Sequence, residues 1–191
     1  MKLYYCKSAC SLSVRIVLNE VDLKTKKTKN EENYLKINPK GAVPALRLDN
    51  GDVLTENQVI MQYLVDTTPK QSLLASVDDV KRYHTLEWVN YIATELHKTL
   101  GIFFHPSLSP EIKNFFMPMI NLKLNYINEH LAKGPYLMGE HFTLPDAYLF
   151  VVIRWAYYFK MDLSAYKHLE HFMKVVAERP AVITSLEQEK L

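Results

Sequence analysis

Two different spacings of hydrophobic positions divide the chain. Over residues 1–70, short apolar runs alternate with helical patterns, whereas over 79–191 the apolar residues recur almost only at the three- and four-residue spacing of helices. Such a switch in pattern marks a change of architecture. The sequence therefore predicts a small α/β domain over 1–70 and an all-helical domain over 79–191, joined by a polar linker.

The first domain is expected to begin with a strand at Lys2–Tyr5 and a helix over Ser11–Glu20. The dipeptide Asn50–Gly51 stands between two apolar runs and is the strongest short signal of a β-hairpin. A helix opens at Thr55 and runs to about Asp66. The stretch 22–33 is polar and shows little pattern.

The second domain is expected to hold five helices. A threonine cap, an early proline and an acid at the third helical position form a capping signature over 143–146. The helix after this cap lacks a polar face, which is typical of the centre of a bundle. The predicted helices are Val80–Leu100, Pro110–Ala132, Ala147–Met161, His168–Ala177 and Ala181–Glu189.

Composition and charge exclude several classes of protein. The chain has 191 residues, 48% of them hydrophobic, and 23 Lys and Arg against 21 Asp and Glu give a net charge of +2. These values argue against intrinsic disorder and against a dedicated nucleic-acid binder. No apolar run approaches the ~20 residues of a membrane span, and polar residues interrupt the apolar positions near the start, so we expect neither a membrane protein nor a signal peptide.

The cysteines and histidines narrow the chemistry further. The two cysteines, Cys6 and Cys10, are too few for a disulfide scaffold and predict free thiols in the reducing cytoplasm. Their spacing is not that of a Cys-x-x-Cys redox pair. None of the seven histidines shows the spacing of a metal site, so no metal and no resident cofactor is expected.

Cys10 lies directly before a predicted helix, with Ser11 beside it. Exposed N–H groups and the helix dipole favour negative charge there, so the thiol is expected to have a lowered pKa. The same position could instead hold the thiolate of a bound small molecule. A buried small residue or a helix cap without chemistry is the alternative.

Three further positions could carry chemistry, each with a plainer alternative. Val43 precedes Pro44 at a strand start, where the bond can be cis and the Val43 backbone can pair with an extended ligand. Glu56 and Asn57 open a helix and could hold an ammonium and a carboxylate, although Thr55 could simply cap that helix. His97 could polarise a substrate or donate to a sulfur, although a histidine between domains is commoner.

Taken together, these segments resemble the bacterial beta class of glutathione transferases over nearly the whole chain. An N-P-x-G-x-V-P block at 38–44 marks the superfamily, while the A-C-S-L block at 9–12 and the E-L-H-K block at 95–98 point to the beta class. Further similar segments are Tyr4-Tyr5, Leu54-Thr55-Glu56, Ile60–Leu64, Tyr91–Thr94 and Phe142-Thr143 with Asp146-Ala147-Tyr148.

The resemblance implies a thioredoxin-like N-terminal domain, a helical C-terminal domain and a homodimer. It implies that Cys10 contacts the glutathione sulfur and can form a mixed disulfide with it, with Ser11 beside it, and that Tyr5 is not essential. Carried over by motif, the remaining glutathione contacts would be Lys26 for the glycyl carboxylate, Val43 for the cysteinyl backbone, Glu56 and Asn57 for the γ-glutamyl end, His97 and Lys98 near the sulfur, and Asn90 and Glu95 reaching across the dimer. We expect Phe103, Phe104 and Trp155 to form the apolar wall for a second substrate.

Two departures from the family pattern matter. Asn57 stands where the superfamily has Ser or Gly, and its amide can still donate and accept hydrogen bonds. After Glu20, the turn and most of the second strand are missing, about 5–6 residues. Either the sheet lacks a regular edge strand, or Val21–Thr28 supplies a short substitute, and Lys26 lies beside this gap.

The resemblance implies an enzyme that conjugates reduced glutathione to small hydrophobic electrophiles in a pocket between the domains. Two alternatives stay open. One is glutathione-dependent thiol transfer or peroxide reduction through Cys10. The other is a non-catalytic protein that binds glutathione or hydrophobic ligands on the same fold, because a fold does not fix an activity.

Overall fold

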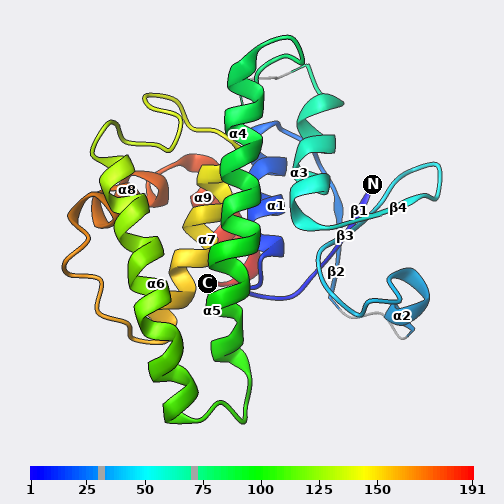
Figure 1. Cartoon of the computed structure of the whole chain (residues 1–191). Coiled ribbons are helices and arrows are strands. Elements are labelled where there is room, and N and C mark those ends of the chain that lie inside the picture. Colours follow the sequence, from blue (N-terminus) through cyan, green and yellow to red (C-terminus); the bar gives the residue numbers. More distant parts are fainter. Residues whose placement is uncertain (30–32, 70–72) are drawn as a thin grey trace. The chain divides into compact units, whose positions relative to one another are not determined.

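The computed structural model describes residues 1–29, 33–69 and 73–191 (Figure 1). The chain forms two compact units. The first unit comprises residues 1–76 and 178–191, and the second comprises 77–177. The first unit therefore includes a helix from the far end of the chain, a helix that its sequence pattern alone groups with the helical region 79–191.

The first unit is built on a four-stranded mixed sheet in the order β2-β1-β3-β4. Strand β1 (Lys2–Tyr5) pairs in parallel with β2 (Lys26–Lys29) and antiparallel with β3 (Ala45–Arg47). Strand β4 (Val53–Thr55) pairs antiparallel with β3, and Leu46 lies opposite Leu54. The predicted N-terminal strand and hairpin are confirmed.

The sheet has a regular edge strand after all. Although the segment after Glu20 is short and polar, Lys26–Lys29 pairs in full register with β1, from Lys26 opposite Lys2 to Lys29 opposite Tyr5. The second of the two alternatives, a short substitute from the segment after the gap, is the one observed. An edge strand needs backbone pairing on one side only, so a polar tetrapeptide can fill this position.

Helices α1 (Ser11–Glu20), α3 (Asn57–Asp66) and α9 (Pro180–Glu189) pack together, and α1 lies between the other two. The short α2 (Tyr34–Ile37) lies on the opposite side of the sheet (Figure 1). Two successive residues of β1 show this, because side chains alternate between the faces of a strand. The ring of Tyr4 contacts that of Tyr34 in α2, while the ring of Tyr5 lies against Arg15 of α1.

The second unit is a helical bundle. Its elements are α4 (Val80–Tyr91), the π-helical η1 (Ile92–His97), α5 (Lys98–Gly101), the 3₁₀ turn η2 (Ile102–Phe104), α6 (Pro110–Leu131), α7 (Leu144–Tyr158) and α8 (Lys167–Ala177). Helix α7 contacts α4, η1, α5 and α8, and most of its side chains are buried. The predicted position at the centre of the bundle is confirmed.

The start of α7 is fixed by a buried carboxylate. Asp146 is fully buried, and its Oδ2 accepts hydrogen bonds from the Thr143 backbone N–H and hydroxyl, both 2.8 Å long. Its Oδ1 accepts the Leu137 N–H at 2.8 Å. The capping box that the sequence predicts is therefore present, and it also ties the preceding loop to the helix.

Over the described part of the chain, no helix combines the length and apolarity needed to cross a bilayer.

Candidate functional site

Cys10 is the N-cap residue of α1 and is almost completely buried, with 7% of its surface exposed. Its Sγ donates to the carbonyl oxygen of Val43, at 3.3 Å. The preceding turn is held by Ser11, whose hydroxyl donates to the Cys6 carbonyl at 3.1 Å and accepts the Cys6 N–H at 3.3 Å. The structure thus brings together Cys10, Ser11 and Val43, three residues that the sequence predicts for one site.

The expected lowering of the Cys10 pKa is wrong for the protein without a ligand. Burial raises the pKa of the Cys10 thiol to about 12 and outweighs the lowering by the backbone N–H of Ser11. Desolvation penalises a buried anion more than one helix terminus stabilises it. Cys10 is therefore a neutral thiol at physiological pH, and it serves as a hydrogen-bond donor.

Val43 carries its carbonyl into this site from the segment just before β3. The Val43–Pro44 peptide bond is cis, as the sequence allows. The Ala42 carbonyl next to it accepts hydrogen bonds from Tyr34 and Asn38, each at 2.7 Å. The backbone beside β3 is therefore held in place on one side, with the Val43 carbonyl turned to the thiol.

The start of α3 lies behind the same turn. Glu56 is the N-cap with φ +70° and makes no side-chain cap bond, so the simple Thr55 cap does not describe this helix start. The exposed Glu56 carboxylate pairs with Lys40, whose Nζ also donates to Thr55 Oγ1 at 2.8 Å. An acid that pairs with one ammonium at the surface can pair with another.

Asn57 is buried and links α3 to α1. Its Nδ2 donates to Ser13 Oγ at 2.8 Å, and Ser13 Oγ donates to the Cys10 carbonyl at 2.7 Å. Its Oδ1 is buried without a hydrogen-bond partner among the described residues. An orphaned buried acceptor is costly, so this oxygen is suited to receive a donor from a ligand.

Lys26 is placed only in part. Its backbone lies in β2 opposite Lys2. Its side chain lies outside the described part of the structure, and its predicted contact with a carboxylate stays a prediction.

In the helical unit, His97 ends the π-helical segment η1 and lies in an aromatic cluster. Its Nδ1 is 2.5 Å from the Tyr148 hydroxyl, and its ring packs edge-on against Trp155 with centroids 4.8 Å apart. Burial, with a smaller contribution from the Lys98 charge, lowers the pKa of His97 to about 4. The imidazole is therefore neutral at physiological pH, with one N–H to donate.

Two of the three predicted wall residues belong to this cluster. Phe104 packs edge-on against Trp155 at 5.3 Å, while Phe103 contacts Phe159 at 5.6 Å. Phe104 is half exposed and Trp155 is buried. The structure thus gathers His97, Phe104 and Trp155, with Phe103 joined through Phe159, which also contacts Phe104 at 4.6 Å.

The remaining predicted residues of this unit lie on successive helical segments: Asn90 on α4, Glu95 on η1 and Lys98 on α5. Asn90 and Lys98 are exposed, and Glu95 is half buried. Glu95 pairs with Lys123 of α6 at 2.5 Å, and the hydrogen bond from this ammonium lowers the pKa of the Glu95 carboxyl. None of these contacts tests their predicted reach across a dimer.

From the sequence, Trp155 is predicted only as part of the apolar wall and Tyr148 only as part of a family segment, and neither is paired with His97. Tyr148 and Trp155 are seven residues apart, which places both on one face of α7, and this spacing is a signal that could have paired them with His97. Lys123, the partner of Glu95, and Ser13, the partner of Asn57, have no sequence spacing that could have indicated these contacts.

Among the described residues, no group of three His, Cys, Asp or Glu side chains could hold a metal ion.

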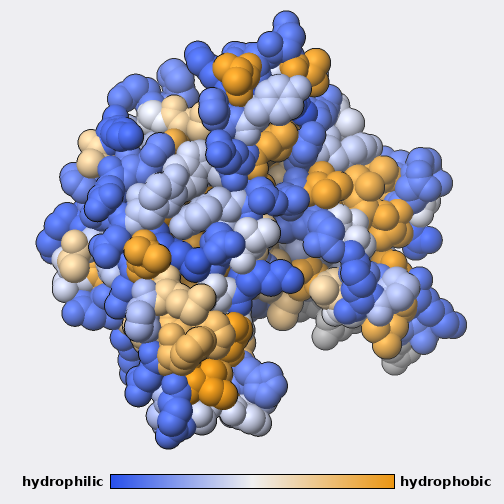
Figure 2. Space-filling view, viewed as in Figure 1, coloured by the Kyte–Doolittle hydropathy of each residue, from blue (hydrophilic) through white to orange (hydrophobic). Residues whose placement is uncertain are grey.

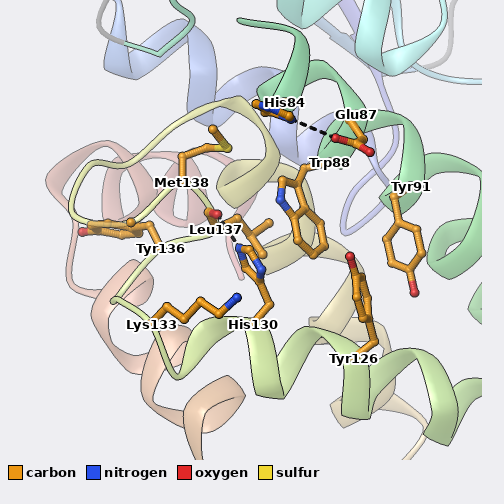
Figure 3. Close-up of a pocket in the computed structure, with 11 residues that line it drawn as sticks. His84, Glu87, Trp88, Tyr91, Tyr126, His130, Lys133, Tyr136, Leu137 and Met138 are labelled. Atoms are coloured by element: carbon orange, nitrogen blue, oxygen red, sulfur yellow. Dashed lines mark hydrogen bonds and ion pairs between the residues drawn. The ribbon is translucent and has the colours of Figure 1, made fainter. Parts of the chain in front are cut away.

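A separate pocket of about 510 Å³ opens between α4, α6 and the turn 136–139 (Figure 3). The indole of Trp88 stacks on Tyr126 with centroids 5.5 Å apart, and the ring of His130 lies 4.5 Å from it. Nε2 of His130 donates to the Leu137 carbonyl at 2.8 Å. This pocket contains none of the predicted site residues.

Comparison with known proteins identifies the family. Residues 7–67 match the family model of the glutathione S-transferase N-terminal domain, and residues 91–180 match that of the C-terminal domain. Glutathione S-transferase GstA of Escherichia coli O157:H7 is 46% identical over the full length of both chains. The chain belongs to the glutathione S-transferase family.

Solved structures agree with this assignment. A sphingomonad glutathione S-transferase complexed with glutathione is 33% identical with a TM-score of 0.95, and each chain is covered completely. A bacterial beta-class glutathione S-transferase of Sphingomonas chungbukensis is 31% identical with a TM-score of 0.94, covering 99% of this chain and 98% of that one. The predicted beta-class resemblance and the glutathione transferase fold, with a thioredoxin-like first unit, are confirmed.

Proposed function

We propose that this protein is a glutathione transferase that conjugates reduced glutathione to small hydrophobic electrophiles. One observation carries the proposal: a neutral, buried Cys10 thiol at the N-terminus of α1 donates to the Val43 carbonyl. That arrangement supplies a donor for a ligand's sulfur and an acceptor for a ligand's backbone at adjacent points. The glutathione-bound structure of the sphingomonad relative supports the choice of ligand.

Ligand binding breaks one hydrogen bond, that from Cys10 to Val43, and forms three. The cysteinyl N–H of glutathione takes the Val43 carbonyl, as a peptide does when it adds to a strand edge. The Cys10 S–H, released from that carbonyl, then donates to the glutathione sulfur, and the Ser11 N–H at the helix start adds to it. A thiolate that receives these donors has a lowered pKa. The ionised group is thus the sulfur of glutathione and not that of Cys10.

The γ-glutamyl end fits the start of α3. This end carries an ammonium and a carboxylate side by side. Glu56 takes the ammonium in place of Lys40, the orphaned Asn57 Oδ1 accepts one of its protons, and the free N–H groups of the helix start take the carboxylate. We assign the glycyl carboxylate to Lys26, as its motif implies.

The helical unit supplies the second substrate's side. Phe104 and Trp155, with Phe103, provide apolar surface, and His97 supplies a neutral N–H toward a leaving group. Lys98 is exposed and adds positive charge near His97. In the reaction the thiolate sulfur forms a bond to an electrophilic carbon, the leaving group departs with its electron pair, and the thiol proton is released to solvent. Positioning and stabilisation of the negative sulfur supply the catalysis.

The raised Cys10 pKa favours conjugation over thiol transfer or peroxide reduction. Those redox reactions need Cys10 as an attacking thiolate, and a thiol with a pKa of about 12 is almost wholly protonated at neutral pH. Names and bound ligands among the relatives likewise support an enzyme over a binding protein without activity.

The experiment compares conjugation of a chloronitroarene with reduction of a glutathione mixed disulfide. Cys10→Ala removes the donor and is expected to lower kcat/KM for conjugation roughly tenfold. Cys10→Ser keeps an O–H donor and should retain most of this activity. The matched control is Cys6→Ala, which removes the exposed thiol. Equal loss in the Ser and Ala variants, or faster disulfide reduction than conjugation in the wild type, contradicts the proposal, as does glutathione binding with no turnover.

We further propose a homodimer in which Asn90 and Glu95 reach the glutathione of the neighbouring subunit. A stripe of exposed apolar residues on one face of α6 supports it: Phe115, Met119, Leu122 and Tyr126 are 41–72% exposed. Figure 2 shows apolar surface gathered near the start of α6. A contiguous exposed apolar stripe is typical of a protein interface.

Leu122→Arg tests the dimer. The exposed Leu122 lies in the middle of the stripe, and a buried arginine without a partner is unfavourable in an interface. We expect sedimentation to show a dimer for the wild type and a monomer for this variant. Leu35→Arg is the control, because Leu35 is 65% exposed on α2, outside the stripe. A wild type that sediments as a monomer overturns the proposal.

We also place the protein in the cytoplasm. Both cysteines are free thiols, and the proposed reaction consumes reduced glutathione, so a reducing compartment suits both.

A further inference from the structure

A buried carboxylate from α9 enters the turn that carries Cys10. The side chain of Glu189 is fully buried, and its Oε1 accepts from Arg15 Nε of α1 at 2.9 Å. Its Oε2 accepts the backbone N–H of Ser8 at 3.1 Å. One side chain, 179 residues along the chain from Cys10, thus joins α9 to α1 and to the Cys6–Cys10 turn.

The hydrogen bond from the Ser8 N–H to Glu189 is made at the residue of the turn with the least favourable backbone conformation. Ser8 has φ +61°, in the left-handed region that residues with a Cβ rarely adopt. On the other side, Cys6 is held by its two hydrogen bonds with Ser11. Glu189 and Ser11 therefore fix the two halves of the turn, and Cys10 begins the helix two residues after Ser8.

The buried Arg15–Glu189 ion pair contributes more to the positions of α1 and α9 than to the stability of the fold. The Arg15 guanidinium lies 4.2 Å from the centre of the Tyr5 ring, and its side chain is 2% exposed. Its Nη2 is buried without a hydrogen-bond partner among the described residues, and Nη1 reaches Gln188 only at 3.5 Å. A buried pair with an unsatisfied nitrogen recovers little of its desolvation cost, but it does set the register of the elements it joins.

We propose that Glu189 is a positioning residue for Cys10: through the Ser8 N–H and Arg15 it sets the Cys6–Cys10 turn and so directs the Cys10 Sγ toward the ligand's sulfur. This inference rests on the proposed role of Cys10 in binding glutathione. It assigns to α9 a part in the glutathione site, although α9 itself touches neither the thiol nor Val43 in the described contacts.

The test uses the full chain with Cys6→Ser as background, so that Cys10 is the one remaining thiol. Glu189→Ala removes the carboxylate that accepts the Ser8 N–H and is expected to speed alkylation of Cys10 in the ligand-free protein roughly tenfold, because the turn loosens. In the enzyme with both cysteines, it is expected to raise KM for glutathione about fivefold while KM for the electrophile stays the same.

Two controls separate positioning from general loosening. Glu187→Ala removes an exposed acid from the same helix. Arg179→Ala breaks the pair in which Arg179 Nε and Nη2 donate to Glu20 at 2.8 and 3.0 Å, which weakens α9 on α1 without touching Ser8. Neither is expected to change Cys10 alkylation or KM for glutathione. If Arg179→Ala has the same effect as Glu189→Ala, the positioning role is overturned.

A rescue variant makes the role specific. Because glycine adopts positive φ without a steric cost, Ser8→Gly in the Glu189→Ala protein is expected to bring the raised KM for glutathione part of the way back to the wild-type value. If Glu189→Ala does not fold, Glu189→Gln replaces it: the amide keeps the shape but has one acceptor oxygen where the carboxylate uses two, so it cannot accept from both Ser8 and Arg15, and a smaller change in the same direction is expected. Unchanged alkylation and KM in the Glu189 variants overturn the inference. Changed alkylation in a protein that does not bind glutathione instead overturns the proposed function and leaves the positioning of Cys10 intact.

Discussion

Single residues in this protein take their chemistry from burial more than from sequence position. Cys10 stands at a helix start, where sequence reasoning predicts a thiolate, yet burial raises its pKa to about 12. His97 is likewise held neutral by burial. Position along the chain is visible in a sequence, but the depth of a side chain depends on distant elements, so the identity of Cys10 could be predicted and its protonation state could not.

The Cys10 titration can be measured directly. In the Cys6→Ser variant, the rate of alkylation of Cys10 is expected to rise about tenfold per pH unit from pH 7 to 10 without levelling, because the reactive thiolate stays a minor species below a pKa of about 12. A plateau that begins below pH 9 would show that Cys10 is ionised in the free protein and would return it to the role of nucleophile.

His97 makes stability depend on pH. Its pKa falls from 6.5 to about 4 on folding, so the unfolded chain binds a proton at a pH where the folded protein does not. The stabilisation is fully present above 6.5 and is lost as pH falls from 6.5 through 4, by about 3 kcal/mol. His97→Gln is expected to remove this part of the acid loss in chemical unfolding, and the exposed control His171→Gln is not. Identical acid profiles for all three proteins would contradict it.

Elements with strong local signals could be predicted closely. The ranges of β1, α1 and the β3–β4 hairpin follow from apolar spacing and from Asn50–Gly51. Strand β2 could not be assigned, because four polar residues become a strand only through pairing with β1. The π-helical segment that ends at His97 could not be predicted from the sequence either, since its residues continue the apolar spacing of α4.

Loss of the N-terminal cap of α7 is expected to lower the stability of the protein strongly. Asp146→Ala leaves the N–H groups of Leu137 and Thr143 without their buried acceptor, and we expect it to lower the free energy of unfolding by roughly 3 kcal/mol. Denaturant unfolding followed by circular dichroism measures this. Asp162→Ala is the control, because this acid is exposed and its hydrogen bonds are local ones with Ser164, and it is expected to change the free energy of unfolding little. Equal effects would show that the cap is not buried as described.

At the scale of the whole molecule, the two compact units are not two consecutive stretches of the chain. Helix α9 belongs to the first unit, tied to α1 by Glu189–Arg15 and by Arg179–Glu20. Its amphipathic pattern resembles that of the preceding helices, so no local signal reveals the partner on which it packs. The family motifs could locate Cys10, Val43 and Glu56, whereas the residues that hold them, Ser13 and Glu189, emerge only from the three-dimensional contacts.

The central claim is that the start of α1 stabilises glutathione as a thiolate through a neutral Cys10 donor. The most direct measurement is an ultraviolet titration of the thiolate of glutathione bound to the protein. The account predicts a bound thiol pKa about 1–2 units below the free value of about 8.5, and a return toward that value in Cys10→Ala but not in Cys6→Ala. A bound thiol that titrates like free glutathione, or a lowered pKa that survives Cys10→Ala unchanged, would contradict it.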